Sequence, residues 1–229
     1  MDRSTESIGA VASPSAVGPA GVALPPYRTL LMPVLRTPSG SRDLAALATG
    51  LVRDLAGLMA RLGDVLIVPL AGDPEAPNKL GVPVTAPPTS AAIDRMLAAR
   101  KADFVICGEL RPIRDGLVVQ LALLGPGGVQ RWSDSVELVE GLVQDARMVL
   151  AANVVEAATG RRKDVRRARQ GGTRSVEAYK RVCLARFPLL DPEKRVRLLE
   201  EASEIDPEYA EARLLLADRL ETLGRRVEA

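Results

Sequence analysis

The chain has 229 residues, of which 47% are hydrophobic and 3% aromatic, and its formal net charge is +2. This length predicts one large domain or two small ones, with a core of Leu, Val, Ala and Ile. The near balance of charge excludes a global attraction to nucleic acid or anionic lipid, so any such attraction must be local. Arg heavily outnumbers Lys, which indicates a GC-rich bacterial genome.

The chain contains no histidine. This excludes Ser-His-Asp, Cys-His and H-E-x-x-H chemistry, and we expect no enzymatic activity, metal or cofactor. The two cysteines, Cys107 and Cys183, lie in no metal-ligand spacing, and we expect reduced, buried thiols. No run of about 18 apolar residues and no secretory h-region is present, so we expect a cytoplasmic protein with no membrane partner.

Residues 1–26 are rich in Gly, Pro, Ala and Ser and are predicted to be a disordered tail. Residues 27–160 are predicted to form an α/β domain. It begins with a strand at 29–35, weakened by Pro33, and a helix at 42–62 that Ser41 caps and Gly63 ends. A second buried strand follows at 65–70, and a strand-helix-strand unit predicts parallel pairing. The apolar face of the helix comprises Leu44, Leu51, Leu55, Leu58, Met59 and Leu62.

The proline-rich stretch 71–89 is predicted to be a long loop, either functional or a variable insertion. A helix at 90–101 should turn Ile93, Met96 and Leu97 inward. Strands at 102–111, 117–124 and 129–138 form a meander, because Asp115-Gly116 predicts a tight hairpin and 125–128 a second turn. A helix at 141–158 ends the domain at Gly160. It is expected to bury Leu142, Ala146, Val149, Leu150 and either Asn153 or Val154.

The predicted order is therefore β-α-β-α-β-β-β-α, a mixed sheet with helices packed on it. A basic linker follows at 161–175, within which 161–174 reads RRKDVRRARQGGTR. No aromatic residue interleaves with its charges, so a solvated linker is favoured over a nucleic-acid contact. The candidate anion-binding residues are Arg161, Arg162, Lys163, Arg166, Arg167 and Arg169.

The remainder, 176–229, is helical in pattern, with helices expected at 175–187, 192–204 and 207–223. Aligning 176–209 with the chain from Ala210 onward gives a period of 34 residues, and LLEEASEIDPEYAEARLLLADRLETLG resembles a tetratricopeptide (TPR) repeat. We expect one full repeat and a partial second, with the chain a fragment of a longer array. The resemblance implies a concave groove that binds a protein or peptide. Its groove-facing positions would be Glu177, Lys180, Leu184, Leu214 and Asp218.

The α/β part resembles the TolB amino-terminal-like domain that precedes TPRs in bacterial regulatory proteins. The resemblance rests on ALATGLVRDLAGLMARL, DVLIVPL, ADFVICGELRPIRDGLVVQLAL and VQRWSDSVEL. It implies a relay or scaffold rather than an enzyme. We therefore expect a protein–protein interaction module acting through its TPR groove and α/β domain. The alternative is a nucleic-acid-associated regulator that uses the basic linker.

Overall fold

The computed structural model describes residues 27–33, 35–37, 41–70, 86–164 and 172–224. The predicted tail 1–26 and most of the predicted loop 71–89 lie outside these ranges. Five strands form one mixed sheet in the order β2-β1-β3-β4-β5. Their bounds are β1 Arg28–Met32, β2 Val65–Pro69, β3 Phe104–Ile113, β4 Gly116–Leu124 and β5 Gln130–Val139. β1 pairs in parallel with β2 and β3, and the β3-β4-β5 meander is antiparallel, so the predicted mixed sheet is confirmed.

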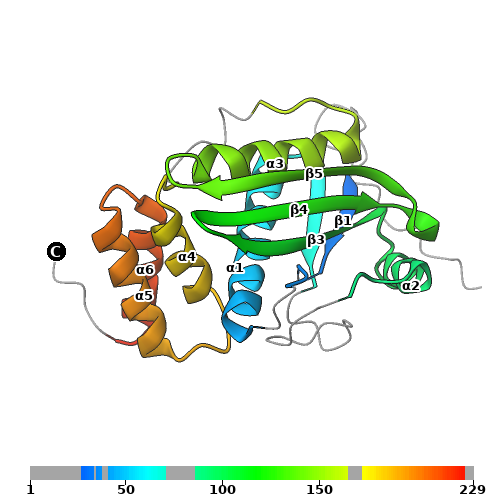
Figure 1. Cartoon of the computed structure of the whole chain (residues 1–229). Helices are drawn as coiled ribbons and strands as arrows, with labels where there is room; N and C mark the ends of the chain where they lie inside the picture. The colour runs from blue at the N-terminus through cyan, green and yellow to red at the C-terminus, as the bar shows by residue number, and fades with distance from the viewer. Residues whose placement is uncertain (1–26, 34, 38–40, 71–85, 165–171, 225–229) are drawn as a thin grey trace, which may run out of the picture.

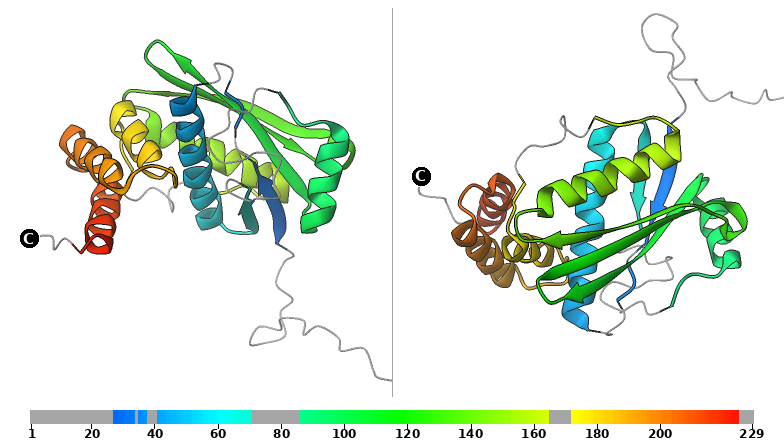
Figure 2. Two further views of the ribbon diagram at one scale, coloured as in Figure 1. Left: turned by 90° about the horizontal axis from the view of Figure 1, so that it is seen from below. Right: turned by 45° about the horizontal axis from the view of Figure 1, so that its top comes forward.

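Helices cover the sheet on both faces. α1 (Arg42–Leu62) and α3 (Val143–Thr159) pack on one face and form the larger core with it, while α2 (Ser90–Arg100) packs on the other. The side chains of successive strand residues point to opposite faces. Accordingly, Leu30 belongs to the core under α1 and its neighbour Leu31 to the core under α2. Figure 2 shows these layers from two directions.

Helix α1 has the predicted bounds because its ends carry specific signals. The Ser41 hydroxyl accepts a hydrogen bond from the Leu44 amide at 3.4 Å, and Gly63 ends the helix with φ of 78°. The predicted apolar face is buried, except that Leu62 is only partly so. The helix is also buried on its other side, where α4 packs against it.

The predicted hairpin is confirmed between β3 and β4. Val119, Leu121 and Leu123 are fully buried on the face covered by α1 and α3, while Gln120 and Ala122 alternate with them on the opposite face. Gly116 sits where two strands approach closely, since a Cβ atom there would lie 2.1 Å from the Leu138 carbonyl oxygen.

The predicted buried face of the helix at 141–158 is partly wrong. Leu150 and Val154 are buried as expected, but Leu142 and Val149 are 55% and 44% exposed. The buried stripe consists of Val143, Arg147, Leu150 and Val154, so its second position is an arginine. A prediction that considers only apolar residues omits that arginine, and it therefore assigns Leu142 and Val149 to the buried face instead. Asn153 is half-buried and donates a hydrogen bond to Asp134.

Three further helices complete the described chain: α4 (Val176–Ala185), α5 (Pro192–Ile205) and α6 (Ala210–Thr222). α6 begins three residues after Pro207, which lies in the turn before it rather than in its first turn as expected. α4 packs between α1 and α5, and α5 packs against α6. The helical segment therefore lies beside α1, at the end of the molecule away from α2 (Figure 1). Among the described residues, no helix combines the length and apolarity needed to cross a membrane.

Candidate partner-binding site

The two charged groove residues predicted on α4, Glu177 and Lys180, are engaged in ion pairs along the helix surface. The Glu177 carboxylate lies 2.6 Å from the Arg181 guanidinium and 3.8 Å from the Lys180 ammonium. Arg181 also pairs with Glu201 of α5 at 2.6 Å. Surface pairs of this kind contribute little to stability. The side chains of Glu177 and Lys180 are 47% and 28% exposed, so a partner could contact both.

Leu184 has a different environment from the other predicted groove residues. It is half-buried and packs against both the large core under the sheet and the core of the helical segment. This position makes it part of the junction between α4 and the sheet domain.

Helix α6 is the most open element of the helical segment. Of its thirteen residues only Ala212 is fully buried. Leu214 is 71% exposed, the largest exposed fraction of any large hydrophobic side chain among the described residues, and Asp218, also exposed, lies one turn further on. The structure thus places Leu214 and Asp218 together on α6, and Glu177 and Lys180 together on α4. The assignment of all five residues to partner binding stays a prediction.

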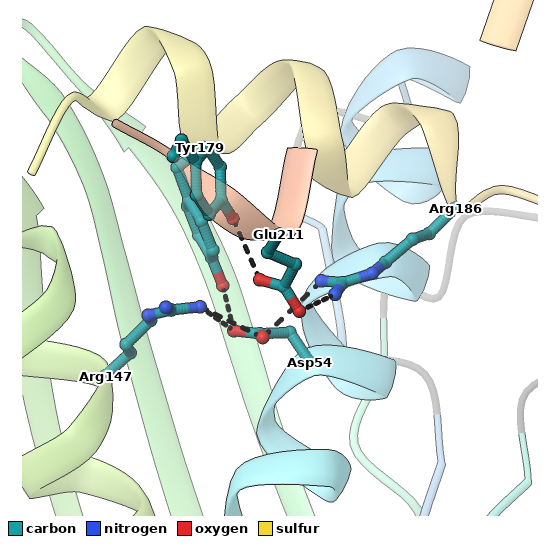
Figure 3. A network of polar contacts seen from close by, with 6 residues as sticks. Asp54, Arg147, Tyr179, Arg186 and Glu211 are labelled. Atoms are coloured by element: carbon teal, nitrogen blue, oxygen red, sulfur yellow. Dashed lines mark hydrogen bonds and ion pairs between the residues drawn. The ribbon is translucent and has the colours of Figure 1, made fainter. Parts of the chain in front are cut away.

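A buried polar network joins these helices to the sheet domain (Figure 3). At its centre, both oxygens of the Asp54 carboxylate on α1 accept hydrogen bonds from Arg147 of α3, at 3.0 and 2.9 Å. The Tyr179 hydroxyl donates to Oδ2 of Asp54 at 2.7 Å, and the Arg186 guanidinium lies 3.4 Å from Oδ1. Arg186 also pairs with Glu211 of α6 at 2.5 Å. Three helices, α1, α3 and α4, therefore meet at the Asp54 carboxylate, and Arg186 links α6 to it through Glu211.

The network is balanced in charge, with two carboxylates facing two guanidinium groups. Burial by itself would raise the pKa of Asp54, but Arg147, Arg186 and the Tyr179 hydrogen bond together hold the pKa of this carboxyl below its ordinary value. Burial, with the adjacent Asp54 charge, raises the pKa of Tyr179 well above its ordinary value, so the phenol keeps its proton and remains a donor. The Arg147 guanidinium lies 5.2 Å from the centre of the Tyr179 ring, a cation–π distance.

Two further contacts fix the start of the helical segment. The Gly141 amide donates to the carbonyl of Arg174 at 2.9 Å, and the Val176 amide donates to the Glu140 carboxylate at 2.9 Å. Close packing adds to them, since a Cβ atom on Gly50 of α1 would lie 1.9 Å from the Cys183 carbonyl oxygen of α4. The helical segment is therefore attached directly to the sheet domain by α4.

Sequence reasoning missed this network. Asp54 lies within the apolar run LVRDLAGLM of α1, four residues after Gly50 and four before Leu58. A carboxylate on the face where a helix is otherwise apolar is the signal that could have found it, because such a group must be paired when it is buried. Its partners lie 93 or more residues away, and no local pattern identifies them.

The basic linker is only partly described. Arg161 and Lys163 both form ion pairs with Asp64 in the turn between α1 and β2, and the Lys163 side chain is 11% exposed. The Lys163 hydrogen bond is the main cause that lowers the pKa of Asp64. Arg162 is exposed, while Arg166, Arg167 and Arg169 lie outside the described residues. Of the three candidate anion-binding residues that the structure describes, Arg161 and Lys163 thus have a partner within the chain.

The described residues contain no group of three His, Cys, Asp or Glu side chains that could hold a metal ion. Both cysteines are free, as expected. Cys183 is buried as predicted, but the prediction of burial is wrong for Cys107, which is partly exposed because it lines a cavity on the sheet face. Burial raises the pKa of each thiol to about 12.

No protein-family model and no curated protein matches the chain. Among solved structures, TolB from Acinetobacter baumannii is similar with a TM-score of 0.40 and 11% identity, over 59% of this chain and 29% of that one. The chain thus spans less than a third of that protein. A PelC dodecamer from Paraburkholderia phytofirmans is similar with a TM-score of 0.38 and 16% identity, over 62% of this chain and 94% of that one. At TM-scores below 0.5 these likenesses support no assignment of family or function.

Proposed function

We propose that the chain is a non-catalytic protein-interaction module in which a TPR-like helical segment binds a partner protein or peptide. One observation carries the proposal: Leu214 on α6 is 71% exposed. A large apolar side chain this open, with Asp218 one turn away, offers a partner one apolar contact and one charged contact.

The packing of α4 and α5 supports the TPR-like part of the proposal. Ala178, Leu199 and Ala202 are buried between the helices. The two alanines let the paired helices approach closely, as stacked repeats require, and Leu199 fills the space between them. Tyr209 is buried in the same core, at the junction with α6.

The attachment of α4 and α6 to the sheet domain supports the scaffold part. The network around Asp54 gives the helical segment one orientation relative to the sheet, so a partner bound on α6 would be held in a defined position. A scaffold or regulatory module needs this property, because its role is to place one protein relative to another.

The test is a pull-down from native lysate with three forms of the whole chain: wild type, Leu214→Asp, and the matched control Leu189→Asp. Leu189 is also strongly exposed, at 66%, but lies between α4 and α5. We expect a protein retained at high salt by the wild type and the control and depleted at least about tenfold with Leu214→Asp, the loss that corresponds to about 1.4 kcal/mol.

The same experiment tests the nucleic-acid alternative. Phosphate contacts weaken steeply with salt, whereas an apolar contact does not. If all three forms retain the same material, and nuclease or salt removes it, the proposal is wrong and the exposed part of the basic linker becomes the binding surface.

A further inference from the structure

A cavity of about 410 Å³ lies on the sheet face opposite α1 and α3, between the meander and α2. This volume is within the usual range for small-molecule sites, roughly 300–1,000 Å³. α2 lies at the opposite end of the molecule from the helical segment (Figure 1), so this cavity is separate from the proposed partner-binding surface.

The cavity exists because one cross-strand row of the sheet has small side chains. Cys107 pairs with Ala122 across β3 and β4, and Ala122 pairs with Ser133 across β4 and β5. The row on one side carries the longer Glu109 and Gln120, and the row on the other carries Leu124. These six residues all line the cavity. The row of small side chains forms its floor, and the two rows of longer side chains form its sides.

One end of the cavity is apolar. Met96 of α2 and Leu124 of β4 line it, together with Pro87 and Pro88 from the segment before α2. Met96 and Leu124 also pack against the core under α2, which holds them in place. An apolar group bound at this end would be transferred from water to an apolar surface that is already formed, which is favourable.

The other end is polar, and it holds the Arg36 guanidinium beside the Glu109 carboxylate. Arg36 lies 2.7 Å from Oε2 of Glu109, and Arg111 lies 3.2 Å from Oε1 of the same carboxylate. Among the described residues that line the cavity, Glu109 is the one acidic residue, and both its oxygens are engaged. Arg111 does not line the cavity, but its pairing with Glu109 offsets part of that carboxylate's charge, and the Arg36 guanidinium carries five N–H donors, more than Glu109 can accept.

Amide and hydroxyl groups along the floor also favour an acceptor, with Ser133 in the small row and Gln130 paired across the strands with Leu124. The Gln130 side-chain amide donates to the Ser133 hydroxyl oxygen at 3.1 Å, which leaves the hydroxyl proton available. Gln120 contributes a second amide, on the row next to Ser133. Arg36 is 31% exposed, so its charge is only partly screened by solvent.

We propose that this cavity binds a small amphipathic carboxylate, with its apolar body against Met96 and Leu124 and its carboxylate on the Arg36 guanidinium. Two sources share this chemistry: a fatty carboxylate, and the carboxyl terminus of a peptide that ends in an apolar residue.

The test is calorimetric titration of the whole chain with two pairs of probes. Octanoate is compared with 1-octanol, and N-acetylleucine with N-acetylleucinamide, so each pair differs in the carboxylate. We expect at least one carboxylate to bind at least about tenfold more tightly than its uncharged partner, because hydrogen bonds to charged groups are stronger than those between neutral groups. The pair that shows the larger difference identifies the source. Equal affinity within both pairs, or no binding of either carboxylate at millimolar concentration, overturns the proposal.

Variants of the whole chain locate the site. Arg36→Gln keeps a hydrogen-bonding group but removes the charge, and should weaken the carboxylate about tenfold while leaving its uncharged partner unchanged. Ala122→Phe fills the floor and should abolish binding of both. Arg114→Gln, in the exposed turn outside the cavity, is the matched control and should change nothing. If Arg36→Gln folds and binds like Arg114→Gln, the assignment of the carboxylate to Arg36 is wrong. The wild-type probe pairs decide the proposal on their own if a variant does not fold.

Discussion

The hydroxyl of Tyr179 on α4 donates a 2.7 Å hydrogen bond to the carboxylate of Asp54 on α1, although the two residues are 125 positions apart in the chain. Both side chains are buried. Because Asp54 also binds Arg147 of α3, one carboxylate connects the sheet domain to the first helix of the helical segment.

Asp54→Asn should destabilise the protein strongly. The substitution leaves two buried guanidinium groups facing one carboxylate, and breaking a buried pair costs about 3–5 kcal/mol. Urea denaturation of the whole chain measures this as a lower free energy of unfolding. The matched control is Asp43→Asn, which alters an exposed residue in the first turn of the same helix and should cost less than about 1 kcal/mol. Equal effects of the two variants would contradict a stabilising role for the network.

The contribution of Asp54 should disappear in acid. Its pKa in the folded protein lies below the unfolded value of about 3.9. The ionised carboxylate therefore stabilises the fold fully above that value, and the stabilisation is lost as the pH falls through the folded pKa. The difference in unfolding free energy between wild type and Asp54→Asn should be constant from pH 7 to about pH 5 and narrow below about pH 4. A difference that widens in acid would mean that the folded pKa is raised.

Two glycines of α1 should respond in opposite directions to replacement by alanine. Gly50→Ala places a Cβ atom 1.9 Å from the Cys183 carbonyl oxygen, so α1 and α4 must separate. We expect the free energy of unfolding to fall by about 1–3 kcal/mol. Gly57→Ala meets only the end of the Arg61 side chain at 3.7 Å and should stabilise the helix by about 0.5–1 kcal/mol. Thermal unfolding of both variants checks the signs. A stabilising Gly50→Ala would show that α4 does not rest on α1.

Both thiols should react slowly with a disulfide reagent in the native protein. Burial raises each thiol pKa to about 12, so the reactive thiolate is scarce at pH 8. Cys107 is partly exposed and should react before the buried Cys183, while both should react at once after denaturation. The Cys107→Ser variant assigns the phases. Faster labelling of Cys183 would show that α4 separates from α1 in the native state.

The sequence by itself determined the elements of the α/β domain and their order. Ser41 and Gly63 delimit α1 because capping is decided by neighbouring backbone groups. Asp115 and Gly116 predict the hairpin, and the alternation of Val119, Leu121 and Leu123 predicts the buried face of β4, because turn chemistry and side-chain period are local properties.

Tertiary structure decided which polar groups are buried and which surfaces meet. Arg147 belongs to the buried stripe of α3 because Asp54 lies opposite it on α1. The pattern of apolar residues along α3 does not reveal this pairing. The cavity beside α2 likewise depends on Cys107, Ala122 and Ser133 falling in one row of three strands. Cross-strand register and charge pairing join residues that are distant in the chain, so they are fixed only when the whole chain has folded.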